Sequence, residues 1–232
     1  MIGPIHQDQA YHRFADARSF FGVPNFADVA SSLAFVIVGI AGVLLLWRSA
    51  AGRFSAPAEW RAYWWFFAAA ALAGIGSAYY HLAPDDARLA WDRLPIAVGF
   101  MCLLCALITE RSRVAPGATL LVVLAILGAA SVLYWRAFDD LRPYALVQFG
   151  SLAAILVICA WLPARFSQGW MVFAVAGVYA LAKWCELRDP AIYQVTGGSL
   201  SGHTLKHLLS AAAIAWLLWW LMVRQPASPG HG

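Results

Sequence analysis

Long apolar runs are the feature of this sequence that most limits its fold. A helix needs about 20 residues to cross a hydrocarbon core roughly 30 Å thick, and seven uncharged or nearly uncharged stretches of the chain approach that length. Apolar residues make up 62% of the chain and charged residues 12%, against about 45–50% and about 25% in soluble domains. The sequence therefore predicts an all-α membrane protein and excludes a soluble globule.

The runs predict a seven-transmembrane helix bundle. Short connections and polar chain ends indicate one membrane domain over residues 1–232, with no repeat. The first 25 residues are polar and mixed in charge, unlike a signal peptide, so we expect the first run to remain as an anchor. The expected spans are residues 26–48, 61–81, 88–109, 114–135, 143–163, 167–187 and 203–223.

The charged residues and the cysteines exclude two other classes of function. The net charge of +4 indicates loops that face lipid head groups, so we expect no nucleic-acid partner. All four cysteines fall inside apolar runs, where they are expected to be buried small hydrophobic residues. They are Cys102, Cys105, Cys159 and Cys185.

Two of the predicted spans reach membrane-spanning length only through ionisable residues. The runs 94–109 and 208–223 reach spanning length only by extending backward, through Asp92 in one case and through His203 and His207 in the other. Ionisable residues in a membrane are costly and usually mark a functional site. Because seven spans alternate in direction, the end of the second span and the starts of the third and seventh lie on the N-terminal side. We therefore expect His81, Asp92, His203 and His207 at one end of the bundle.

The histidines in this group have the spacing of metal ligands. His203 and His207 are four residues apart on a helix, so both rings can reach one metal, with His81 as third ligand. Three protein ligands and one open position are typical of catalytic zinc, which activates water and polarises carbonyl groups. Ser77, one turn before His81, and Asp92 would flank the site. A single histidine at a helix end is commonly only an interfacial residue, so the prediction depends on the convergence of all three.

Three segments resemble the alkaline ceramidases. They are Ser77–His81, Asp92 within Trp91–Pro95, and His203–Leu209, with Asn25–Gly39 similar to the first-span motif of the same group. The ceramidases belong to a seven-span hydrolase superfamily that also includes the adiponectin and progestin receptors and enzymes that remodel glycosylphosphatidylinositol lipids. The resemblance covers about residues 20–223.

The resemblance implies a zinc-dependent intramembrane amidase acting on ceramide. It implies that His81, His203 and His207 bind Zn²⁺, that Asp92 handles the proton of the metal-bound water, and that Ser77 steadies this water or the oxyanion. The products would be a sphingoid base and a free fatty acid. The chain departs from the family at Arg93, where ceramidases commonly have an acidic residue, and in the segment 19–28, which has few carboxylates for the calcium site of eukaryotic members.

Other functions remain open at this point. The same residues suit a hydrolase of another N-acyl or ester lipid, or a seven-span receptor or signalling protein with a structural zinc. Release of fatty acid by purified protein separates an enzyme from a receptor. A metal or proton transporter needs polar residues in both halves of its pore, and the fourth and fifth spans are nearly bare of them. Metal uptake into vesicles would identify a transporter.

The sequence also predicts the orientation in the membrane, the route of the substrate and the setting of the remaining ionisable residues. Acidic residues are concentrated in the N-terminal-side loops, and with the resemblance this predicts an exterior N-terminus and active site and a cytoplasmic C-terminus. A membrane lipid substrate would enter sideways into an apolar cavity bordered by Phe149, Ala153 and Val175. Lys183 and Glu186 are expected to pair, with a possible role in head-group binding. The remaining histidines are expected to be solvated in the chain ends: His6, His12 and His231.

Overall fold

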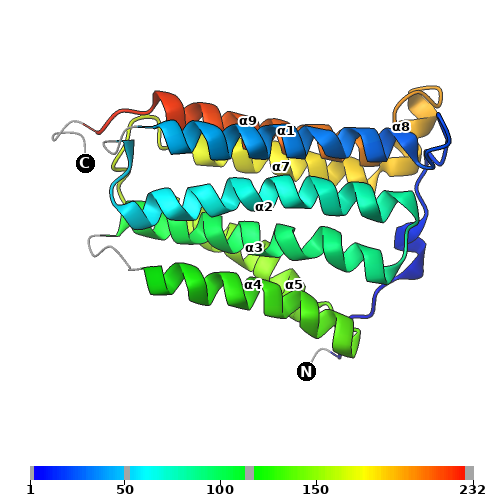
Figure 1. Cartoon of the computed structure of the whole chain (residues 1–232), viewed down its shortest axis with the longest axis horizontal. Helices are drawn as coiled ribbons and strands as arrows, with labels where there is room; N and C mark the ends of the chain where they lie inside the picture. The colour runs from blue at the N-terminus through cyan, green and yellow to red at the C-terminus, as the bar shows by residue number, and fades with distance from the viewer. Residues whose placement is uncertain (1–2, 50–52, 113–117, 228–232) are drawn as a thin grey trace.

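The protein is a bundle of helices that run side by side along its long axis (Figure 1). The computed structural model describes residues 3–49, 53–112 and 118–227, and within these ranges every regular element is a helix. The long helices are α1 (Phe26–Arg48), α2 (Pro57–Leu82), α3 (Asp86–Arg111), α4 (Ala118–Phe138), α7 (Met171–Leu187) and α9 (Gly202–Val223). The shorter elements are η1 (Gln9–His12), α5 (Arg142–Ala145), the π-helix η3 (Leu146–Gly150), α6 (Ser151–Trp161) and α8 (Asp189–Val195). The all-α prediction is confirmed.

Five helices of the described residues are long and apolar enough to cross a membrane. They are Phe26–Arg48, Asp86–Arg111, Ala118–Phe138, Arg142–Trp161 and Gly202–Val223. Their outer faces expose large apolar side chains, such as Ile37, Val122 and Ile126, which suits contact with lipid. The chain is therefore a multi-pass integral membrane protein. Helix α7 has 17 residues, and α2 carries Glu59 and Arg61 in its first turns, so seven spans remain a prediction.

Close approach of backbones at glycines sets the order of the first three helices. A Cβ on Gly39 of α1 would lie 2.4 Å from the backbone nitrogen of Ala71 in α2. A Cβ on Gly76 of α2 would lie 2.2 Å from the carbonyl oxygen of Trp91 in α3. Small residues allow such contacts between membrane helices, where packing supplies much of the association energy. Helix α2 is thus held between α1 and α3.

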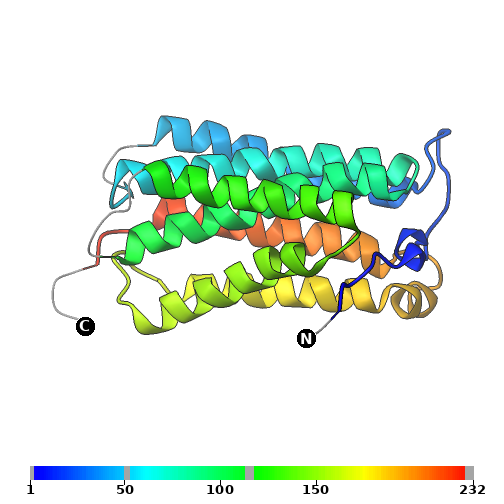
Figure 2. The ribbon, with the colours of Figure 1, turned by 90° about the horizontal axis from the view of Figure 1, so that it is seen from below.

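The segment 3–25 crosses the end of the bundle at which α2 finishes and α9 begins (Figures 1 and 2). The backbone N–H groups of Gln7 and Ala15 donate to Asp139 at 3.1 Å and to Asp189 at 2.9 Å, respectively. The His12 ring contacts the Tyr80 hydroxyl at 2.9 Å. These bonds fix the segment over the helix ends.

Solvation of the tail histidines was predicted correctly for His6 and wrongly for His12. The His6 side chain is 68% exposed, whereas the His12 side chain is 11% exposed. Hydrogen bonds to Tyr80 and Asp86 hold the His12 side chain against the helices of the bundle. Nothing in the local sequence indicates that contact. His231 lies outside the described residues. The four cysteines are free and buried, as predicted.

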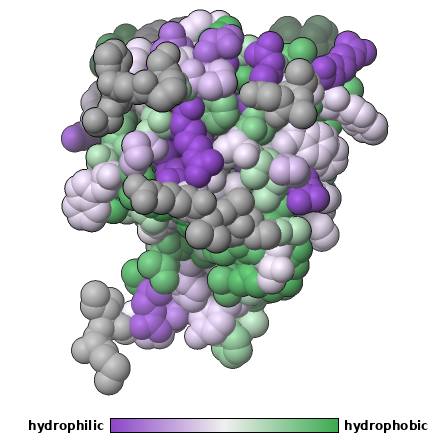
Figure 3. All heavy atoms as spheres, turned by 90° about the vertical axis from the view of Figure 1, so that its left-hand side faces the viewer, coloured by the Kyte–Doolittle hydropathy of each residue, from purple (hydrophilic) through white to green (hydrophobic). Residues whose placement is uncertain are grey.

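A buried charged cluster closes the other end of the bundle. Arg224, at the end of α9, donates to Glu59 of α2 at 2.5 Å and to Glu110 of α3 at 2.9 Å, and all three side chains are fully buried. The ring centre of Phe166 lies 3.9 Å from the guanidinium carbon. Figure 3 shows this end from outside, where hydrophilic side chains are spread among hydrophobic ones. The cluster ties three helices together far from the histidines.

Candidate metal centre

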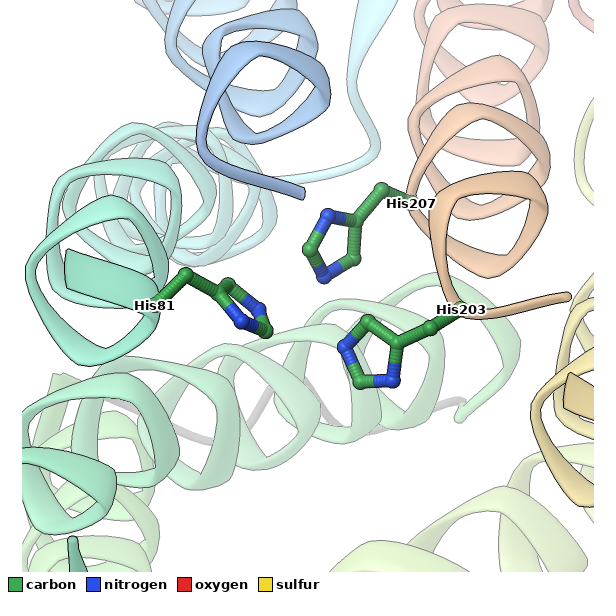
Figure 4. A group of neighbouring side chains, drawn as sticks. All are labelled: His81, His203 and His207. Carbon is green, nitrogen blue, oxygen red and sulfur yellow. The ribbon is translucent and has the colours of Figure 1, made fainter. Parts of the chain in front are cut away.

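Three buried histidines from two helices meet at the end covered by the N-terminal segment. His81 lies in the last turn of α2, and His203 and His207 lie in the first two turns of α9. One nitrogen of each ring lies within 4.8 Å of the corresponding nitrogens of the other two. The rings are turned toward a common point (Figure 4). The structure therefore brings together all three predicted metal ligands.

The start of α9 is fixed by polar contacts that place both of its histidines. The Ser201 hydroxyl caps the helix by accepting from the backbone N–H of Thr204 at 3.0 Å. The Asp189 carboxylate, at the start of α8, accepts from the backbone N–H of His203 at 2.8 Å. A Cβ on Gly202 would lie 2.2 Å from the Cys185 carbonyl oxygen, so only glycine permits this approach to α7. These contacts aim the first turn of α9 at the end of α2.

A layer of hydroxyl groups from α1 lies behind the histidines. The Ser31 hydroxyl contacts Nδ1 of His207 at 2.9 Å, which leaves Nε2 of that ring for the side of the other two histidines. The Ser32 hydroxyl donates to the Asp28 carbonyl oxygen at 2.7 Å and lies 3.1 Å from the Ser77 hydroxyl oxygen. Such outer contacts orient a ligand ring and set its basicity. The signal in the sequence is the polar Ser31-Ser32 pair inside an apolar span, within the segment Asn25–Gly39 that resembles the first-span motif.

Aromatic rings cover the histidines on two sides. The Phe14 ring of the N-terminal segment packs edge-on against His81 and His203, with 4.6 Å between ring centres in each case. The Phe35 ring of α1 lies 5.7 Å from that of His207. The rings keep water from part of the site, which strengthens electrostatic interactions within it. Sequence reasoning did not identify Phe14.

Ser77 and Asp92 lie next to the histidines, as predicted. The Ser77 hydroxyl is 3.5 Å from Nε2 of His207, and the Asp92 carboxylate lies beside Ser77 and lines the same cavity. The close approach of α2 and α3 at Gly76 positions Asp92, because the contact is made with the peptide that precedes it. The ligand group comprises the histidines alone, so Asp92 stands beside the candidate metal position.

The three rings fit a divalent metal of borderline softness such as Zn²⁺. Each offers a neutral imidazole nitrogen, the usual donor for such metals, and His81 Nδ1 has no hydrogen-bond partner within the protein. Lys206 opposes binding, since its ammonium lies 2.9 Å from Nε2 of His203. A metal on that nitrogen would displace the ammonium, which retains its ion pair with Glu186 at 2.9 Å.

A cavity of about 400 Å³ extends from the histidine end into the bundle. Its deep part is apolar and includes Leu103, Leu107 and Leu217. Phe149 and Val175 line it, as predicted, but Ala153 does not. Ala153 faces outward because the π-helix Leu146–Gly150 adds a residue to one turn and so rotates the helix that follows.

The wall of the cavity nearest the histidines has a polar part. Lys183 and Glu186 pair on α7, as predicted, and Glu186 also accepts from Lys206 of α9. The Tyr11 hydroxyl donates to Glu186 at 3.1 Å. Burial, and secondly the Glu186 carboxylate, raises the pKa of Tyr11 well above its ordinary value, so this hydroxyl stays neutral. Gln148, from the π-helix, donates to the Tyr179 hydroxyl at 2.7 Å.

Comparison with known proteins adds no identity. No protein-family model matches the chain, and no curated protein matches it. Fold and site together define a multi-pass helical membrane protein with a buried three-histidine cluster that could bind a metal ion.

Proposed function

We propose that this protein is a zinc-dependent intramembrane amidase that hydrolyses ceramide or a similar N-acyl lipid to a sphingoid base and a fatty acid. The observation that carries the proposal is the position of His81, His203 and His207 beside Ser77 and Asp92, at the polar end of an apolar cavity. A structural metal would need the ligands but neither the neighbouring carboxylate nor the cavity. The resemblance to the alkaline ceramidases supports the same assignment.

The histidines, Asp92 and Ser77 have different roles in the proposed hydrolysis. Zn²⁺ held by the three histidines would supply a Lewis acid for the amide carbonyl and lower the pKa of water. Asp92 accepts a proton from the attacking water at a carboxylate oxygen and passes it to the amine nitrogen as the C–N bond breaks. The Ser77 hydroxyl donates a hydrogen bond to the carbonyl oxygen as negative charge develops there. The hydroxyl group of the water thus ends on the acyl carbon of the fatty acid, and the proton of the water ends on the amine.

The cavity suits a substrate that does not leave the bilayer. Withdrawing an acyl chain from hydrocarbon costs about 0.8 kcal/mol per CH₂, so the amide must reach the histidines while its tails stay in apolar surroundings. The leucine-lined part of the cavity offers those surroundings directly below Ser77 and His207. We therefore propose that the lipid enters from the side.

Purified protein incubated with a panel of N-acyl lipids, with and without a chelator, tests the proposal when products are read by mass spectrometry. Asp92→Asn should lower hydrolysis by about 10²–10⁴-fold, the usual contribution of a general base, with metal content near that of the wild type. His207→Ala should lose the metal, and His6→Ala, which removes an exposed histidine, should change neither quantity.

Two results would contradict this assignment. If no lipid of the panel releases fatty acid, the amidase proposal is wrong. If Asp92→Asn loses metal as readily as His207→Ala, Asp92 is a ligand and the division of roles is wrong.

We also propose that the histidine end faces the exterior and the C-terminus the cytoplasm. Acidic residues such as Asp86, Asp139 and Asp189 are concentrated at the histidine end, and the resemblance to the alkaline ceramidases supports the same orientation. A reporter fused to the C-terminus should be active when it is of a type that works only in the cytoplasm. Activity of a reporter that works only outside the cytoplasm would reverse the orientation.

A further inference from the structure

We infer that the polar wall of the cavity binds an anionic group, a carboxylate or a phosphate, on the amine portion of the lipid. The inference rests on the proposed amidase function for the nature of the ligand, and it narrows the substrate from neutral ceramide to an N-acyl lipid whose amine portion carries an anion. It is carried by the surroundings of Arg93, Lys183 and Lys206, which line the cavity together with Asp92 and Glu186.

Arg93 is a buried cation with an unused donor. Arg93 is 7% exposed and lines the cavity, and its Nη1 atom has no hydrogen-bond partner within the described part of the protein. The guanidinium carbon lies 5.4, 4.4 and 5.0 Å from the ring centres of Tyr11, Trp135 and Tyr144. These rings stabilise the charge, but a ring face does not replace the acceptor that a buried N–H requires. A ligand oxygen reaching this wall would supply that acceptor.

The two lysines leave the same wall with an excess of positive charge. Lys183 and Lys206 both pair with Glu186, which also accepts from the Tyr11 hydroxyl. One carboxylate is therefore shared by two ammonium groups. With Arg93 counted against Asp92, the cations on this wall outnumber the carboxylates by one. Charges in apolar surroundings are weakly screened, so the excess favours an anion.

The location of the wall assigns the anion to the amine portion of the substrate. The acyl chain fills the leucine-lined part of the cavity, and the amide lies at Ser77 and Asp92. The other charged side chains of the cavity lining are Arg93, Lys183, Lys206 and Glu186. Arginine binds carboxylate and phosphate oxygens through paired hydrogen bonds, and the hydroxyl groups of a neutral sphingoid base would leave the excess charge unbalanced.

Binding of two matched pairs of lipids tests the inference. N-palmitoylglycine and N-palmitoylethanolamine differ in a carboxylate against a hydroxyl group, and ceramide 1-phosphate and ceramide differ in a phosphate. Affinities would be measured by calorimetric titration of detergent-purified wild type, Arg93→Met and Arg93→Lys. We expect wild type to bind the anionic member of at least one pair about tenfold or more tightly than the neutral one. The pair that shows the preference identifies the anion.

The variants show whether Arg93 is responsible. Arg93→Met should bring the ratio of the two affinities close to one while binding of the neutral lipid is retained, and Arg93→Lys should keep part of the preference. If Arg93→Met does not fold, as absent neutral-lipid binding would show, Lys183→Gln should reduce the ratio instead.

Three results would overturn the inference. They are equal affinities in both pairs for wild type, a preference unchanged in Arg93→Met and Lys183→Gln, and a preference lost in His207→Ala but kept in Arg93→Met, which would place the anion at the histidines. None of these measurements requires turnover. A protein that hydrolyses no lipid yet binds anions through Arg93 refutes the proposed function alone.

Discussion

Gly76→Ala should separate α3 from α2 and displace Asp92 without disturbing the histidines. The added Cβ would lie 2.2 Å from the Trp91 carbonyl oxygen and 3.1 Å from the Asp92 backbone nitrogen. No real Cβ contact is as short as the first of these, so the two backbones must separate by about 1 Å. Displacement of that size at a reacting group can lower a rate about 10²-fold.

Helix α3 should yield in this variant because α2 is fixed on its other face. Cβ atoms on Gly39 and Gly74 would lie 2.4 Å from the Ala71 nitrogen and 2.7 Å from the Ser32 carbonyl oxygen, which shows how tightly α1 and α2 pack. The metal ligands lie on α2 and α9 and should keep their geometry. We therefore expect hydrolysis to fall about 10²-fold while metal content stays near that of the wild type.

Gly177→Ala is the matched control. This glycine lies in α7, and an added Cβ would meet nothing within 4 Å. Both substitutions gain up to about 1 kcal/mol of helix propensity, but only Gly76→Ala bears an overpacking cost of about 1–3 kcal/mol. Thermal unfolding in detergent, metal analysis and hydrolysis would be measured on both variants. Equal stability and equal hydrolysis would refute the claim that this backbone contact holds Asp92 in place.

Two further predictions concern side-chain contacts at the two ends of the bundle. Ser31→Ala removes the partner of His207 Nδ1 and should weaken metal binding about 10–100-fold, measured by competition with a chelator; unchanged affinity would show that the hydroxyl has no part in orienting the ring. Glu59→Ala removes one of the two buried carboxylates that pair with Arg224 and should lower the free energy of unfolding by about 3–5 kcal/mol, because a buried positive charge is left in excess. Metal affinity should be unaffected in that variant, and a loss there would show that the two ends are coupled.

The sequence predicted the helices and the histidine cluster because both depend on local patterns. Apolar runs of spanning length define helices whatever their neighbours, and the spacing of His203 and His207 places both on one helix face. His81 joined them by the alternation of spans, which is also a property of the sequence.

Contacts between distant segments could not be predicted in this way. Phe14 belongs to a polar segment without periodicity, and its position depends on bonds to residues more than 130 positions away, such as Asp139 and Asp189. Arg224, at a helix end, has the pattern of an interfacial residue, and only the packing of α2, α3 and α9 reveals that it is buried. The outward turn of Ala153 depends on a π-helix that no residue type signals.

The attachment of the N-terminal segment has a consequence for biosynthesis. Chains are made from the N-terminus, yet Tyr11 and Ala15 find their partners in Glu186 and Asp189, 175 and 174 residues later. Residues 3–25 therefore cannot complete their contacts with the helix ends until nearly all of the chain up to Asp189 has been inserted. Because Phe14 packs on His81 and His203 only after docking, the histidines of the nascent protein stay open to a metal ion until the final step of assembly.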